Sequence, residues 1–116
     1  MTAQEVIENL GLKRHPEGGW FRRTFESSSK LSTVHGDRAL SSCIYYMLNE
    51  NEYSAWHRLA SDETWFFHAG CEIHVHMFGA DGYILKTLGT DMALGHEPQL
   101  TIPAQTTFAA ELCNAG

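Results

Sequence analysis

Apolar residues gather along most of the chain in segments too short for helices, and some of these segments alternate with polar residues. The clearest case is residues 72–79, where Ile73, Val75 and Met77 alternate with polar residues, as in a strand with one buried face. Other segments rich in β-branched and aromatic residues are separated by turn residues at intervals of about 8–12 residues. Strands are predicted at 20–25, 40–49, 54–60, 63–69, 72–79, 83–89, 98–104 and 106–112. This spacing favours an all-β sandwich or barrel.

The N-terminal segment has a helical pattern instead. Apolar residues recur at helical spacing between Thr2, a suitable N-cap, and Gly11, a suitable C-terminal cap. We expect one short helix there, a turn at the Gly18–Gly19 pair, and a polar loop over residues 27–39.

Composition narrows the class of protein. The 116 residues, 43% of them hydrophobic, are enough for a single domain over residues 1–116. The net charge of −6, with only eight Lys and Arg, argues against nucleic-acid binding. No apolar run approaches the roughly 18 residues of a membrane span, and the first residues lack the apolar run of a signal peptide, so a cytoplasmic protein is expected. Cys43, Cys71 and Cys113 form no CxxC pair and are expected to be reduced, mostly buried thiols.

The candidate chemistry centres on His57 and Glu63, which are six residues apart. The two side chains can face one cavity whether they lie on one strand or on two strands joined by a turn. An imidazole and a carboxylate begin a metal site, but a divalent ion normally needs at least three protein ligands. The alternative is a hydrogen-bonded His–Glu pair in a partly buried polar patch.

His57, Glu63 and Gly70 also fall at the spacing of the first cupin motif. The segments HPEGGWFRRTF, CIYYMLNENEYSAWHRLASDETWFFHAG and LGHEPQLTIPAQTTFAA resemble blocks of cupin family 5, a group of largely uncharacterised small cupins. The resemblance implies a double-stranded β-helix, the cupin jelly-roll barrel, with a ligand cavity inside it and homodimerisation.

The resemblance carries over only part of the cupin metal site. The second histidine of the first motif falls at Leu59, and the histidine of the second motif falls at Phe108. With two of four ligand positions apolar, we predict no bound metal and no cofactor, and His57 and Glu63 stay weak metal candidates. A metal-dependent cupin that recruits His74 or His76 is the least favoured alternative.

The family is similar in fold to deoxysugar-nucleotide epimerases, which use a histidine base and a tyrosine acid. This similarity implies His57 as the base, Glu63 as an orienting or competing carboxylate, and Tyr45 or Tyr46 as the acid. Ordinary core packing is the alternative for either tyrosine. We therefore expect a small polar or sugar-like ligand in the barrel and a metal-independent epimerase or isomerase, or else a non-catalytic binding protein.

Aromatic rings and guanidinium groups complete the predicted ligand site. Trp56 and Trp65 are expected in the wall that carries His57 and Glu63, and arginines bind anionic groups by forked hydrogen bonds unless they are simply solvated. The predicted ligand-binding residues are Trp56, Trp65, Arg22, Arg38, Arg58 and Phe108.

Two further expectations concern other parts of the chain. His74 and His76 share one face of their strand with Glu72, which predicts a polar face and only weakly a zinc site.

Family members continue through further strands, and they usually have glycine where this chain has Gln105. A barrel without its last strands has an open edge, so we expect a homodimer, with strand exchange through residues 20–25 as one route.

Overall fold

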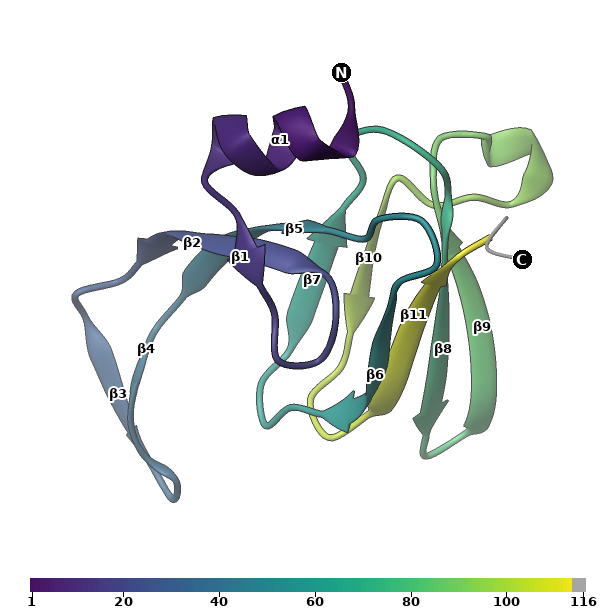
Figure 1. The fold of residues 1–116 in the computed structure, drawn as a ribbon. Helices are drawn as coiled ribbons and strands as arrows, with labels where there is room; N and C mark the ends of the chain where they lie inside the picture. Colours follow the sequence, from purple (N-terminus) through teal and green to yellow (C-terminus); the bar gives the residue numbers. More distant parts are fainter. Residues whose placement is uncertain (114–116) are drawn as a thin grey trace. The chain divides into compact units, whose positions relative to one another are not determined.

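The computed structural model describes residues 1–113, and the chain divides into two compact units, Met1–Met47 and Leu48–Gly116 (Figure 1). Most of the described residues lie in β-strands, and one short α-helix stands at the N-terminus, as predicted. No helix among residues 1–113 is both long and apolar enough to cross a membrane. The closed double-stranded β-helix stays a prediction.

The first unit begins with the expected helix, α1 (Ala3–Leu10). Its N-terminus is capped by Thr2, whose hydroxyl accepts a 3.2 Å hydrogen bond from the backbone N–H of Glu5. Its C-terminus ends at Gly11, which has a left-handed φ of 65°. Both caps are the residues that the sequence indicates.

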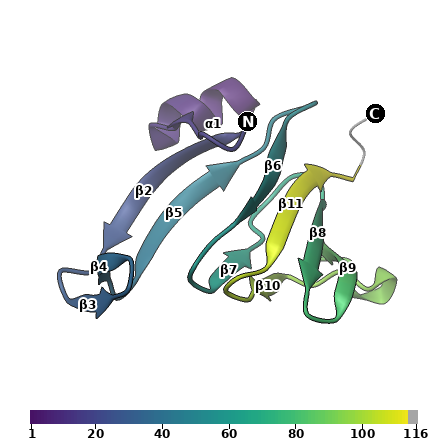
Figure 2. The same cartoon turned by 90° about the horizontal axis from the view of Figure 1, so that it is seen from below.

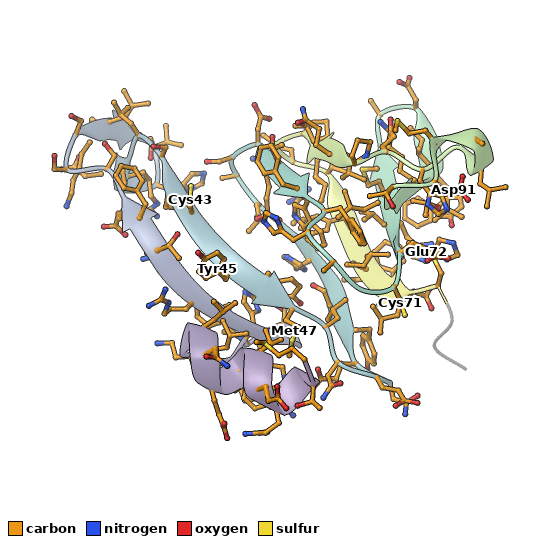
Figure 3. The ribbon with its side chains drawn as sticks, turned by 90° about the horizontal axis from the view of Figure 1, so that it is seen from above. Cys43, Tyr45, Met47, Cys71, Glu72 and Asp91 are labelled. Carbon is orange, nitrogen blue, oxygen red and sulfur yellow. The ribbon has the colours of Figure 1, made fainter. Side chains whose placement is uncertain are left out.

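The helix is followed by a three-stranded antiparallel sheet with the order β1-β2-β5. Its strands are β1 (Lys13–Arg14), β2 (Trp20–Glu26) and β5 (Ser42–Met47). Strands β2 and β5 were predicted, whereas the two-residue β1 is too short to produce a pattern. Cys43, Tyr45 and Met47 alternate along one face of β5 (Figure 3).

The turn that leads into β2 depends on close approach of the backbone to a tyrosine. The hydroxyl of Tyr46 donates a 2.5 Å hydrogen bond to the carbonyl oxygen of Gly18. Gly19 has a φ of 85°, and a Cβ atom there would lie 2.7 Å from the Tyr46 hydroxyl oxygen and 2.8 Å from the carbonyl oxygen of Met47. Only glycine fits this position without a shift of its neighbours.

Residues 27–39 form a hairpin, so the expectation of a loop there is wrong. Strand β3 (Lys30–Thr33) pairs with β4 (Gly36–Ala39) through a two-residue connection. The strands are mostly exposed and polar, and backbone pairing holds them without a buried apolar face. Alternating hydrophobicity is therefore absent, and the sequence pattern cannot reveal this hairpin.

The second unit contains two antiparallel sheets. Strands β6 (Tyr53–Arg58), β11 (Thr107–Leu112), β8 (Ile73–Gly79) and β9 (Gly82–Leu88) lie side by side in that order (Figure 2). Strand β7 (Glu63–Phe66) pairs with β10 (Gln99–Ile102). All six strands were predicted. The short 3₁₀ helix η1 (Met92–Leu94) was not.

The core of the second unit lies between these sheets. Val75 of β8 and Phe108 of β11 are 0% and 1% exposed, and Leu100 and Ile102 of β10 are also buried. Full burial of a side chain such as Phe108 contributes roughly 1.5–3 kcal/mol. The alternation predicted over residues 72–79 is confirmed, because Val75 and Met77 face this core.

The cysteines are free, but the expectation that most of them are buried is wrong. Cys43 lies on the exposed part of β5, and Cys71 lies exposed in the turn before β8. Cys113 is half-buried after β11.

Candidate functional site

His57 is held in one orientation by the backbone of its own strand. It lies on β6 opposite Phe108, and the centroids of the two rings are 4.2 Å apart. Its Nδ1 atom lies 2.6 Å from the carbonyl oxygen of Ala55. A carbonyl oxygen only accepts hydrogen bonds, so Nδ1 carries the proton. In the neutral ring, Nε2 therefore has an unprotonated lone pair, which a general base requires.

A β-bulge decides which way His57 points. Phe108 and Ala110 of β11 are two residues apart, but their partners on β6, His57 and Ser54, are three residues apart. The extra residue on β6 turns both His57 and Ser54 toward the face that carries the buried Phe108 and Ala110. The bulge thus brings the imidazole to the core side of the sheet.

Glu63 and Trp65 are placed by β7, where they share one face. The indole Nε1 of Trp65 donates a 2.5 Å hydrogen bond to Oε1 of Glu63. The Trp65 ring also meets the ring of Phe108 edge to face, at 6.3 Å between centroids. Phe108 therefore links His57 to Trp65. We call His57, Glu63, Trp65 and Phe108 the inner cluster.

The inner cluster combines an acceptor of protons with a fixed carboxylate. Within residues 1–113, no hydrogen bond joins His57 to Glu63. His57 is bonded to Ala55, and Glu63 is bonded to Trp65. Both side chains are half-buried beside the fully buried Phe108. Such a set can orient a small polar molecule, and Nε2 of His57 can accept a proton from it.

Trp56 and Arg58 lie on the opposite face of β6 from His57, because successive residues of a strand alternate. The Trp56 side chain is 51% exposed, and its ring approaches the rings of His76 and Phe78. Arg58 is exposed at the end of the strand. The structure does not bring either residue into the inner cluster, and their roles in ligand binding stay predictions.

The other predicted site residues belong to the first unit. The hydroxyl of Tyr46 is engaged with Gly18, whereas Tyr45 is 39% exposed and has the Arg22 guanidinium 5.7 Å from its ring centroid. Tyr45 is therefore the better suited of the two to donate a proton to a ligand. Arg38 lies on the exposed β4 and donates a 3.0 Å hydrogen bond to the backbone oxygen of Asp37. The roles of all these residues stay predictions.

The donor set of the inner cluster is small for a metal ion. Its metal-binding groups are one imidazole and one carboxylate, fewer than the three protein ligands of a typical catalytic zinc site. Among residues 1–113, no group of three or more His, Cys, Asp or Glu is arranged to hold a metal ion. The residues present therefore do not fit the cupin metal. Absence of a bound metal stays a prediction.

A second polar network lies on the opposite face of the four-stranded sheet, and sequence reasoning missed it. Nε2 of His76 lies 2.6 Å from Oε2 of Glu111, and its Nδ1 lies 2.7 Å from the hydroxyl of Tyr83. Alternation predicts that His76 is on a polar face, but no local pattern links it to partners on two neighbouring strands. Only the strand register could have revealed them.

The chain matches a known family and solved structures over its full length. The family described as the cupin superfamily (DUF985) matches residues 4–116. A hypothetical protein from Leishmania major superposes with a TM-score of 0.92 at 30% identity, covering 100% of this chain and 73% of that one. A crystal structure from Shewanella oneidensis superposes with a TM-score of 0.90 at 34% identity, covering 100% of this chain and 72% of that one. No curated protein matches.

Proposed function

The chain belongs to the DUF985 family of the cupin superfamily, and on this premise we propose that it binds a small polar or sugar-like ligand at the inner cluster and epimerises or isomerises it without a metal. The observation that carries the proposal is the hydrogen bond from Nδ1 of His57 to Ala55. It leaves Nε2 as the basic atom of a half-buried imidazole. The mostly β fold with one short helix is consistent with a cupin.

The proposed chemistry is proton removal next to a carbonyl group of the ligand. Nε2 of His57 takes the proton, and the electron pair of the broken C–H bond moves into the carbonyl to form an enolate. A proton returned to the opposite face of that carbon inverts its configuration, and the base then releases the proton that it took. Water supplies the returned proton, and the proton that His57 releases restores the water molecule.

Glu63 and the aromatic rings have supporting roles in this proposal. The carboxylate of Glu63, fixed by the indole of Trp65, accepts hydrogen bonds from ligand hydroxyl groups. Phe108 and Trp65 provide apolar ring surface beside it. The same arrangement serves a non-catalytic binding protein, which is the second candidate function.

Hydrogen exchange separates the two candidates. The protein, stripped of metal by a chelator, is incubated in D₂O with a nucleotide-linked keto-deoxysugar, and NMR follows deuterium incorporation next to the carbonyl. We expect exchange with the unmodified chain and loss of at least about 100-fold with His57→Asn, the range of general-base contributions. Asparagine retains a donor for Ala55 but lacks the basic nitrogen. His35→Ala, in an exposed turn, is the control.

Each outcome has a clear reading. If the ligand binds without hydrogen exchange, and this binding is lost in His57→Asn, the result supports the non-catalytic candidate. Exchange that persists in His57→Asn, or absence of both binding and exchange, contradicts a ligand site at the inner cluster. Elemental analysis that finds about one iron, zinc or manganese per chain, lost with His57→Ala, contradicts the metal-free part of the proposal.

A further inference from the structure

The bulge in β6 has a second consequence, on the side of the sheet away from the inner cluster. Tyr53 and Trp56 are three residues apart and would point to opposite faces of a regular strand. Tyr53 pairs with Glu111, and the bulge between that pair and His57 turns Trp56 to the same outer face. Two aromatic side chains and a carboxylate are thereby brought together on one surface.

The rings on this outer face form a connected set. The ring of Trp56 lies 6.3 Å from that of His76 and 5.5 Å from that of Phe78, centroid to centroid. Tyr83 continues the set, 5.2 Å from Phe78 and 5.9 Å from His76. Trp56, Phe78 and Tyr83 are about half exposed, and Tyr53 is 64% exposed. Large rings with this much accessible area provide ring faces for a ligand.

The charge of Glu111 is held in place beneath these rings. Its carboxylate only accepts hydrogen bonds, so Nε2 of His76 donates to it over 2.6 Å. When His76 is neutral, its Nδ1 accepts from the hydroxyl of Tyr83 over 2.7 Å. His76 of β8 and Tyr83 of β9 thus fix the position of the Glu111 carboxylate.

A groove of about 760 Å³ opens beside this network, within the usual size range of small-molecule sites. Its lining includes Tyr53, Trp56 and His76, together with the carboxylates of Glu52 and Glu111. Among the residues of the described range 1–113 that line it, none is a lysine or an arginine. Negative charge beside exposed aromatic faces is the environment that binds organic cations, through attraction to the ring quadrupole and to the carboxylate.

From this combination we infer that the groove binds a small organic cation, with an alkylated ammonium group against Trp56 and Tyr53 and Glu111 as its counter-charge. A neutral sugar would stack on the same rings but would make no use of the negative charge of Glu111. The site is separate from the inner cluster, because Trp56 and His57 point to opposite faces of β6.

Choline is the probe, and 3,3-dimethylbutan-1-ol is its neutral isostere. Tryptophan fluorescence and ligand-observed NMR are recorded on the whole chain at low salt. We expect saturable binding of choline in the millimolar range and binding of the isostere weaker by at least about tenfold, because the cation supplies most of the attraction. Trp56→Leu should reduce choline affinity by about tenfold or more, and Glu111→Gln by several-fold.

Two control variants locate the site. Phe66→Leu removes another exposed aromatic ring, on β7, and His57→Ala alters the inner cluster. Both should leave choline affinity unchanged. If Trp56→Leu does not fold, as judged by circular dichroism, the ratio of choline to isostere affinity and the Glu111→Gln variant decide the question. Equal affinity for choline and its isostere, binding of glucose in place of choline, or no binding of choline would each overturn the inference.

Discussion

The ring of His57 is oriented by the residue two positions before it, because its Nδ1 atom donates a 2.6 Å hydrogen bond to the carbonyl oxygen of Ala55. This contact lies within a single strand, beside the bulge that turns the imidazole toward the core. The orienting group is therefore the backbone, while the carboxylate of Glu63 is anchored by Trp65. In the proposed function, Glu63 accepts hydrogen bonds from the ligand.

The first prediction concerns the tautomer of His57. With the ring neutral at alkaline pH, we expect the Nδ1–H form, since the Ala55 carbonyl accepts from that atom. Two-dimensional ¹H–¹⁵N NMR of the imidazole nitrogens distinguishes the two forms. The exposed His35 is the internal control and should show the Nε2–H form preferred by free imidazole. An Nε2–H signal from His57 would remove the argument for Nε2 as the base.

The second prediction concerns the turn at Gly19. Gly19→Ala places a Cβ atom 2.7 Å from the hydroxyl oxygen of Tyr46. Gly95→Ala is the matched control, because Gly95 has the same φ of 85° but a Cβ atom there would meet no other atom within 4 Å. The control should lose about 1 kcal/mol through backbone strain. Gly19→Ala should lose about 1–3 kcal/mol more through overpacking. Urea denaturation measures both, and equal losses would contradict the close approach.

The third prediction concerns Gln105, which lies in the turn between β10 and β11. Its φ is 67°, in the left-handed region that costs a residue with a Cβ roughly 1–2 kcal/mol. Gln105→Gly should raise the free energy of unfolding by up to about 1 kcal/mol, because the relief of strain exceeds the entropy that glycine adds to the unfolded chain. Gln99→Gly, in strand β10, should be destabilising instead. Loss of stability in both variants would show that Gln105 is unstrained.

The strands of the second unit could be predicted because the core imposes a pattern on them. Val75 and Met77 face inward and their neighbours face outward, so alternation reveals β8, while turn residues mark the ends of the other apolar strands. The hairpin of β3 and β4 escaped prediction for the opposite reason. It is held by backbone pairing, which does not require any particular order of apolar and polar residues.

The candidate site could be predicted only in part. The motif spacing indicates His57 and Glu63, but the bulge in β6 and the hydrogen bonds to Ala55 and Trp65 depend on strand register. Alternation alone places Trp56 on the face opposite His57. The partners of His76 come from β9 and β11, and no local sequence pattern identifies contacts between strands.

The fourth prediction concerns Cys113. Burial is the main cause that raises the pKa of its thiol from 9.0 to about 11. The charges of Glu72, Glu111 and the nearby Cys71 raise this pKa further, in that order. The thiolate is the reactive form, so iodoacetamide at pH 8.5 should label Cys113 at least about tenfold more slowly in the folded than in the urea-unfolded protein. Peptide mass spectrometry measures both rates. Equal rates would contradict the raised pKa.

The raised pKa of Cys113 also makes the stability of the folded chain depend on pH. The folded chain retains the proton of Cys113 above pH 9, where the unfolded chain begins to release it. The contribution of Cys113 to stability is therefore present below about pH 9 and is lost as the pH rises toward 11. In Cys113→Ser, the free energy of unfolding measured by urea denaturation should no longer show this part of its decrease at alkaline pH. An unchanged alkaline slope in that variant would contradict the assignment.

The last prediction is that the chain forms a homodimer through its first unit. Among residues 1–47, Leu12 is the only hydrophobic side chain that is buried, whereas Phe25 and Ile44 on β2 and β5 are 53% and 41% exposed. Strand β5 also has a hydrogen-bonded neighbour on one side only within residues 1–113. Exposed edges and apolar side chains favour pairing with a second copy, which buries both at about 25 cal/mol per Å² of apolar surface.

Light scattering should therefore give a dimer mass at micromolar concentration, and the melting temperature should rise with protein concentration. Phe25→Asp combined with Ile44→Asp should shift the mass toward the monomer, because a carboxylate buried without a partner is costly. Leu94→Asp is the control, since that residue is 74% exposed on η1 of the second unit. A monomer mass together with a melt that dilution does not change would show that the first unit keeps these side chains in water.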